Sequence, residues 1–314
     1  MASLMPSRIP PPQRSQRPRR AAIEAPLFQA GDGSRVEVYN ESIRGALQRR
    51  LRDEDALREA LADDQIVPWY QPLVDMRTGA IVGAEALARW LHPHRGLLLP
   101  EEFLPVVPDA GMSVALDEQM IRSSLALRRR LAPMVGPDFT VSANLPTRAE
   151  SMAAVLNILV DAAHEPGVNV RGSMLEATES SIIADPSASL AALAQARAAG
   201  FSVALSGAGA GFWSLALERD LPLDVVKLDR SFVRGMATSA ADTALVSTVL
   251  GLASRLRLRT IAEGVEDDAT ARRLLDAGIE YAQGFRYGPA IPAEELERWL
   301  FSGPPWLVSG PTWR

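Results

Sequence analysis

The chain of 314 residues contains no cysteine. Disulfide bonds, thiolate metal sites and a cysteine nucleophile are therefore excluded from its chemistry. Because this composition suits a reducing compartment, we expect a cytoplasmic protein. Histidine is scarce as well, with three residues in the chain. His92 and His94 flank a proline in what we expect to be a solvated loop, so their spacing does not predict a metal site.

Long hydrophobic runs are also missing. No stretch approaches the roughly 18 uncharged apolar residues that a membrane-spanning helix needs. The first residues carry proline and arginine where a signal peptide would be apolar. We therefore expect no membrane span and no export. With 47% hydrophobic and 23% charged residues, the chain has the composition of a globular protein with a large core. Its six tryptophans are expected to be core or surface anchors.

Lysine is nearly absent, since Lys227 stands alone among 33 basic residues. Its retention either marks a site where an arginine fork cannot serve or is a chance survival. The net charge is -5, and the first 20 residues carry five arginines and no acid, which leaves -10 for the remainder. An acidic body argues against nucleic-acid binding, and the Pro/Arg-rich tail is expected to be disordered.

The pattern of hydrophobic residues predicts four segments. Residues 1–40 form a tail and linker, 41–64 a connecting helix, 65–303 the main domain, and 304–314 a C-terminal tail. Within the main domain, short apolar runs alternate with amphipathic helical stretches. Eight runs are expected to be strands: 67–74, 81–88, 139–145, 173–177, 201–205, 225–228, 259–262 and 281–285.

Eight strand-helix units in about 230 residues predict an α/β fold of the TIM-like (β/α)8 barrel type, with an open doubly wound sheet as the alternative. The first two strands are joined by residues 75–79, which are too few for a crossover helix. We therefore expect an antiparallel first strand.

Polar residues gather at the ends of the predicted strands, which is where barrels carry their active sites. They include acids, amides and the single ammonium group: Glu85, Asn144, Glu176, Lys227, Glu263 and Gln283. Oxygen ligands of this kind suit a hard cation such as Mg²⁺ or Mn²⁺, and a neighbouring lysine suits a phosphoryl oxygen or an attacking water.

These residues lie in motifs through which the chain resembles the EAL-domain family, which takes its name from Glu85-Ala86-Leu87. The opening matches are at 69–75 and 83–90, and further matches follow in family order at 141–145, 175–180, 226–232, 262–266 and 283–285. The resemblance covers roughly residues 65 to 303. It implies a barrel that opens cyclic di-GMP to pGpG with two Mg²⁺ or Mn²⁺ ions.

The resemblance also assigns roles by motif. Three residues would bind the first ion: Glu85, Asn144 and Glu176. Lys227 and Glu263 would act catalytically beside the attacking water and the second ion. Four residues would serve the nucleotide side of the site, with the last also holding its polar network: Gln71, Leu87, Arg89 and Gln283. Glu179 would anchor the loop after the fifth strand.

The chain departs from the family pattern after the fifth strand. Where active relatives carry Asp-Asp-Phe-Gly-Thr-Gly, this chain has Ser206 and Gly207 in place of both acids, followed by Ala208 and Ala210 in place of Phe and Thr. Pro289 stands where the relatives have arginine. The resemblance therefore implies at most one weakened Mg²⁺ or Mn²⁺ site with vestigial catalytic residues, and a nucleotide seat without the interaction that an arginine at 289 would make.

Three functions remain open at this point. The first is a degenerate EAL barrel that binds cyclic di-GMP or a signalling protein without hydrolysis, and it is the one that we expect. The second is an active phosphodiesterase that rebuilds its metal site with Asp229 or Glu266. The third is a pure protein-interaction scaffold, because a fold does not fix a function. A homodimer is a further expected assembly.

Overall fold

The computed structural model describes residues 45, 48, 51–107, 110–164, 169–208 and 222–308. The chain divides into a unit of residues 1–48 and a unit of residues 49–314. In the first unit Gly45 and Gln48 are helical. In the second, residues 51–62 form a helix that buries Leu57 and Ala60. The predicted tail, residues 1–40, lies outside the described residues.

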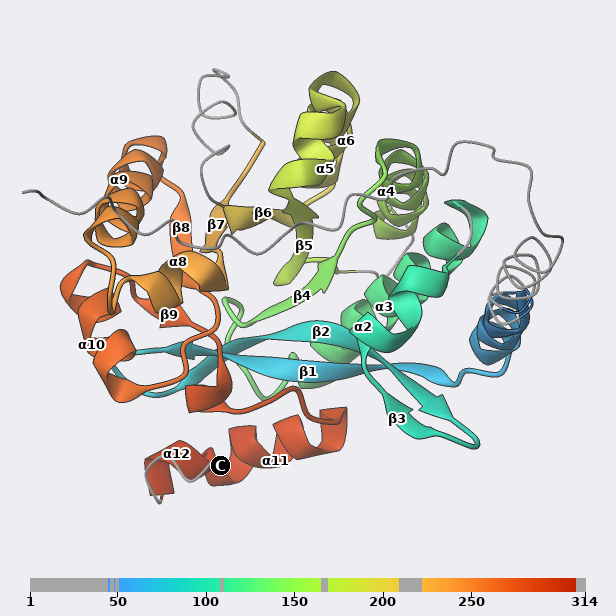
Figure 1. Cartoon of the computed structure of the whole chain (residues 1–314), viewed down its shortest axis with the longest axis horizontal. Helices are drawn as coiled ribbons and strands as arrows, with labels where there is room; N and C mark the ends of the chain where they lie inside the picture. Colours follow the sequence, from blue (N-terminus) through green and yellow to red (C-terminus); the bar gives the residue numbers. More distant parts are fainter. Residues whose placement is uncertain are drawn as a thin grey trace, which may run out of the picture. The chain divides into compact units, whose positions relative to one another are not determined.

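The second unit is built on a closed ring of strands (Figure 1). In chain order the strands are β1 (Ile66–Asp75), β2 (Ile81–His92), β3 (Gly96–Leu98), β4 (Thr140–Asn144), β5 (Ser173–Thr178), β6 (Ser202–Ala208), β7 (Val225–Leu228), β8 (Arg259–Ala262) and β9 (Tyr281–Ala282). The spatial order is β1-β9-β8-β7-β6-β5-β4-β2, and pairing of β1 with β2 closes the ring. The predicted (β/α)8 barrel is confirmed.

Strand β1 runs antiparallel to both of its neighbours in the ring, β2 and β9, as predicted for the first strand. The other neighbouring strands of the ring pair in parallel. The tight turn between β1 and β2 is held by Asp75, whose Oδ1 accepts hydrogen bonds from the backbone N–H groups of Arg77 and Thr78 at 2.8 and 3.1 Å. Gly79 completes the turn with a left-handed φ of 74°.

Strand β3 is not among the eight predicted strands. It pairs with the outer end of β2, where His92 faces Gly96. A three-residue strand is too short to show a period-2 pattern, so the hydrophobic pattern alone cannot reveal it. His92 and His94 lie at this hairpin, where His92 Nδ1 accepts a hydrogen bond from the backbone N–H of His94 at 3.1 Å.

Helices lie around the strands (Figure 1). They are α2 (Pro100–Phe103), α3 (Ala110–Leu131), α4 (Ala149–Ala163), α5 (Glu179–Ala184), α6 (Pro186–Ala198), α8 (Arg230–Gly235), α9 (Ala240–Leu256), α10 (Asp268–Asp276), α11 (Ala293–Ser302) and α12 (Pro305–Val308), with 3-10 turns η1 (Leu104–Val106) and η2 (Phe285–Tyr287). Several begin at a side-chain cap, as Asp185, Ser239 and Asp267 do for α6, α9 and α10.

None of the described helices is both long and apolar enough to span a membrane. The largest hydrophobic cluster of the described residues extends over the strands and most of the helices. A smaller cluster is separate from it and contains Leu73, Met174, Ala204, Val225 and Ile261, all of which come from strands of the ring.

Candidate active site

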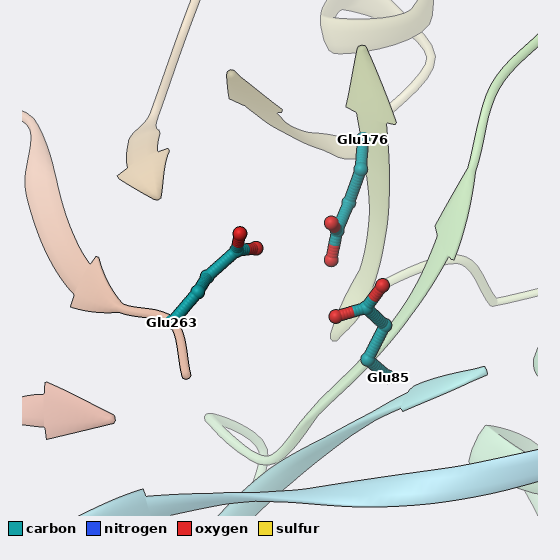
Figure 2. A group of neighbouring side chains, drawn as sticks. All are labelled: Glu85, Glu176 and Glu263. Carbon is teal, nitrogen blue, oxygen red and sulfur yellow. The ribbon is translucent and has the colours of Figure 1, made fainter. Parts of the chain in front are cut away.

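Six predicted site residues come from six strands or the positions just after them. Glu85 lies on β2, Asn144 ends β4, Glu176 lies on β5 and Lys227 lies on β7, while Glu263 follows β8 and Gln283 follows β9. Because side chains alternate along a strand, one inward-facing position near each carboxyl end places these groups at the same end of the barrel. Figure 2 shows the carboxylates of Glu85, Glu176 and Glu263 pointing toward a common space.

Lys227 lies at the centre of this group. Its Nζ is 2.6 Å from Oε2 of Glu85, 2.6 Å from Oε2 of Glu176 and 2.9 Å from Oε1 of Glu263. The lysine side chain is 1% exposed, as is that of Glu176. An ammonium group has three N–H donors, and each is within bonding distance of a different carboxylate. The single lysine of the chain is therefore a buried counter-ion that joins three strands.

Glu85 receives two further hydrogen bonds. Gln283 Nε2 donates to its Oε2 at 2.5 Å, and Asn144 Nδ2 donates to its Oε1 at 3.0 Å. Glu176 differs, because its Oε1 is buried and has no hydrogen-bond partner among the described residues. The polar network is thus complete around Glu85 and leaves one carboxylate oxygen of Glu176 available for a ligand.

The pKa values follow from this arrangement. Burial, together with the charge of Glu85, raises the pKa of Glu176 to about 7, and Lys227 offsets only part of this increase. Burial also raises the pKa of Glu263. For Glu85 burial acts in the same direction, but the charge and hydrogen bond of Lys227 outweigh it and lower the pKa. Burial disfavours the Lys227 ammonium, yet the three carboxylates hold its pKa well above the usual value.

A divalent cation fits this donor set. Glu85, Glu176 and Glu263 each offer an oxygen, and the three oxygens lie within 4.8 Å of one another. With all three carboxylates ionised, the cluster with Lys227 carries a formal charge of -2, from three charges of -1 and one of +1. The unpartnered oxygen of Glu176 is a ready ligand for a hard cation.

The end of β6 brings no carboxylate to the site. Ser206 pairs in register with Thr178 of β5 and is 8% exposed. Gly207 follows with a left-handed φ of 66°, and a Cβ built there would meet no heavy atom within 4 Å. Ala208 is fully buried in the core. Ala210, the remaining altered position, lies outside the described residues.

A second group of predicted residues continues from the acidic cluster along the β1–β2 ribbon. Gln71 pairs with Glu85 across the two strands, Trp69 with Leu87, and Val67 with Arg89. These pairs alternate with others, so their side chains share one face of the ribbon. Glu85 of the acidic cluster and the predicted nucleotide-binding residues therefore lie on the same face of the paired strands β1 and β2.

Arg89 is held in place by two kinds of contact. Its Nη1 donates to the carbonyl of Ala88 at 2.8 Å, and its guanidinium carbon lies 5.7 Å from the centre of the Trp69 ring. Arg89 Nε is buried without a hydrogen-bond partner among the described residues. A nitrogen of the guanidinium thus remains available to an anionic ligand.

Gln71 and the altered position 289 lie in adjacent segments. The Gln71 side-chain amide donates to the carbonyl of Gly288 at 3.2 Å, directly before the half-buried Pro289. Glu179 is the first residue of α5. Its predicted role as a loop anchor stays a prediction, because residues 209–221 of that loop lie outside the described part of the chain.

Comparison with known proteins supplies the family. The model of the EAL domain matches residues 54–290, which is most of the chain. The chain belongs to the EAL-domain family. The resemblance inferred from the motifs is therefore confirmed, and with it a place in a family of cyclic di-GMP signalling proteins.

Three EAL-domain relatives illustrate the similarity. The cyclic di-GMP phosphodiesterase RocR of Pseudomonas aeruginosa is 36% identical over 239 residues, covering 75% of this chain and 60% of RocR. The bifunctional diguanylate cyclase/cyclic di-GMP phosphodiesterase MucR of the same organism is 32% identical over 87% of this chain and 40% of its own length. An uncharacterised protein of Mycobacterium tuberculosis is 32% identical, covering 96% of this chain and 48% of that protein.

Solved EAL-domain structures show the same fold. The MucR phosphodiesterase in complex with c-di-GMP superposes with a TM-score of 0.70 at 32% identity, covering 79% of this chain and 99% of that chain. The EAL enzyme Bd1971 in its cAMP-bound form superposes with a TM-score of 0.73 at 26% identity, covering 86% of this chain and 76% of that chain. The chain spans about half the length or less of several curated relatives that it matches.

Trp69 lies beside the predicted nucleotide-binding residues, and the sequence interpretation did not single it out there. Trp69 is half-buried and packs against the predicted nucleotide-binding Arg89, which is compatible with the expected role of a core or surface anchor. The signal is present in the antiparallel pairing of the first two strands. Alternation places positions 67, 69 and 71 on the same face as 85, 87 and 89, so a tryptophan at 69 belongs beside the seat.

Proposed function

We propose that this chain binds cyclic di-GMP and does not hydrolyse it, acting as a regulator within the cyclic di-GMP system. The observation that carries the proposal is the end of β6, where Ser206 and Gly207 stand in place of the two aspartates expected from active relatives. The six other predicted site residues converge at one end of the barrel. The acidic residues that are missing from the site are therefore confined to the end of β6.

Binding is supported by the face that leads from the acidic cluster to Arg89. Gln71, Leu87 and Arg89 share this face. The Arg89 side chain is held in one orientation by its hydrogen bond to the Ala88 carbonyl and its contact with Trp69. A preorganised arginine side chain loses little conformational freedom when it binds a phosphate. Micromolar affinity corresponds to about -8 kcal/mol, which stacking and a few charge-assisted hydrogen bonds can supply.

Loss of hydrolysis is supported by the donor set. The three glutamates fit one cation, for which Glu85, Glu176 and Glu263 would be the ligands and Asn144 a neighbour of the first. A bound cation would supply Lewis acidity for a phosphoryl oxygen. With Ser206 and Gly207 at the end of β6, the donor set lacks the two carboxylates that the resemblance assigns to the second ion.

The alternative, a rebuilt metal site that uses Asp229 or Glu266, has little support. Asp229 caps α8, and its Oδ1 already accepts hydrogen bonds from the backbone N–H of Ser231 at 2.8 Å and from its hydroxyl at 2.5 Å. Glu266 is 47% exposed and lies 3.9 Å from Arg234. Both carboxylates therefore have other partners, although Asp229 is near enough to Glu263 for its charge to raise the pKa of that residue.

Calorimetry with cyclic di-GMP, with and without Mg²⁺, tests the proposal directly. We expect micromolar binding that EDTA changes by less than about threefold, because Lys227 already supplies a cation inside the cluster. The same samples are then analysed for pGpG. Turnover comparable to RocR that Glu85→Ala abolishes would overturn the non-hydrolytic assignment. No binding heat at high micromolar nucleotide would leave the interaction-scaffold function instead.

A further inference from the structure

A cavity of about 410 Å³ lies at the opposite end of the barrel from the acidic cluster. Its lining includes the first residues of parallel strands, among them Val225 of β7, Arg259 of β8 and Tyr281 of β9. The volume falls within the range of roughly 300–1,000 Å³ that is usual for small-molecule sites.

Small residues lie in the layer of the barrel interior below the active site. Barrels of this type are normally packed by layers of bulky branched side chains. Here the apolar layer is a separate cluster of five residues that includes the small Ala204. Gly83 and Ser142 precede Glu85 and Asn144 by two positions on their strands and also add little volume.

This apolar layer lies between the acidic cluster and the cavity. On β5 the cavity residue Met174 is two positions from Glu176, and on β7 Val225 is two positions from Lys227. Ile261 and Glu263 repeat the spacing at β8. Since residues two apart on a strand face the same side, one layer of side chains separates the two sites.

The polar groups at the cavity indicate the chemistry of its ligand. Tyr281 and Arg259 are among its lining residues, and neither side chain has a hydrogen-bond or ion-pair partner within the described ranges; Tyr281 is half-buried, whereas Arg259 is exposed. The hydroxyl of the half-buried Tyr281 is a donor that a ligand acceptor would satisfy. The carboxylates of Asp75 and Asp138 also line the cavity and would repel an anion. These features favour an uncharged ligand.

We propose that this cavity is a second binding site, for a small uncharged and largely apolar molecule that carries a hydrogen-bond acceptor. Its occupation changes the packing of the layer beneath Lys227 and the glutamates. The cavity does not depend on the proposed nucleotide function, but the coupling between the two sites does.

Methionine methyl groups provide a direct test. Met134 and Met174 line the cavity, whereas Met152 is fully buried on α4 and lines none of the described cavities. We expect acetophenone to shift the methyl NMR signals of Met134 and Met174 in a saturable way below about 10 mM, and to leave Met152 unchanged. Ethylbenzene lacks the acceptor and benzoate adds a charge, so each is expected to bind about tenfold more weakly.

Two variants and a matched control complete the test. Val82→Trp narrows the cavity, so it should weaken acetophenone about tenfold, while Leu190→Trp, at a half-buried site on α6 outside the cavity, should not. If Val82→Trp fails to fold, Tyr281→Phe serves instead, because it should weaken acetophenone and leave ethylbenzene unchanged. Absence of saturable shifts, equal shifts at Met152, tighter binding of benzoate, or indifference to these variants would overturn the proposal.

Coupling is measured separately. Saturating acetophenone should change the affinity for cyclic di-GMP, and the nucleotide should change the affinity for acetophenone by the same factor. If the protein binds acetophenone but not the nucleotide, the proposed function fails and the cavity site stands. If both bind without mutual effect, the coupling is wrong and the site remains.

Discussion

Lys227 and Glu176 form a fully buried ion pair, with Nζ 2.6 Å from Oε2 and each side chain 1% exposed. The same ammonium holds Glu85 and Glu263. The pair therefore determines both the stability of the barrel interior and the charge that a ligand meets there.

Removal of the ammonium should destabilise the protein strongly. In Lys227→Met three carboxylates lose their shared counter-ion in a buried site, which typically costs about 3–5 kcal/mol. Urea denaturation at pH 8 measures the change, with the exposed Arg58→Met as the control. A loss below about 1 kcal/mol would show that hydration or a bound cation already stabilises the carboxylates.

The stability of the protein should depend on pH through Glu176. Its folded pKa of about 7 lies above the ordinary 4.5, so the carboxyl contributes stability that is complete below about pH 4.5 and is lost as the pH rises through about 7. Glu176→Gln removes this titration. We expect its free energy of unfolding to fall less between pH 5 and 8 than that of the unaltered protein, by up to about 1.4 kcal/mol per pH unit. Exposed Glu59→Gln should leave the pH dependence unchanged.

Arg89 should contribute strongly to nucleotide binding. A hydrogen bond to a charged group contributes about 1.5–3 kcal/mol, so Arg89→Ala should weaken cyclic di-GMP about 10- to 100-fold in calorimetry. Trp69→Leu should have a smaller effect, because it removes only the surface against which the guanidinium packs. Arg95→Ala on the β2–β3 hairpin is the matched control. Equal effects of Arg89→Ala and Arg95→Ala would place the nucleotide elsewhere.

Restoring the acids on β6 should restore some hydrolysis. Space is available at Gly207, and aspartate is among the residues that tolerate its left-handed backbone, at about 1 kcal/mol. We expect Ser206→Asp with Gly207→Asp to form pGpG with Mn²⁺ more slowly than RocR does. The double asparagine variant should stay inactive. If rebuilding Ala208 and Ala210 as well gives no activity, Pro289 is the next position to change.

The fold is accessible from sequence because strands and polar strand ends follow patterns along the chain. The place of Lys227 on the barrel can be predicted from its inward-facing position at a strand end, without any knowledge of its neighbours. Its three partners do not follow from the pattern, since they depend on how side chains from separate strands converge. The left-handed φ of Gly207 cannot be predicted from the sequence either, because glycine adopts positive and negative φ about equally readily.

The direction of β1 determines where the chain enters the barrel. A barrel strand of the usual parallel kind would start at the end of the barrel opposite the acidic cluster. Strand β1 instead starts at Ile66, which pairs with Trp90, and Trp90 lies nearer the C-terminal end of β2 than Glu85 does. The helix of residues 51–62 therefore joins the barrel on the face where Arg89 and Trp69 lie. A mechanical displacement of that helix would reach the predicted nucleotide seat through a few residues of one strand, without crossing the barrel.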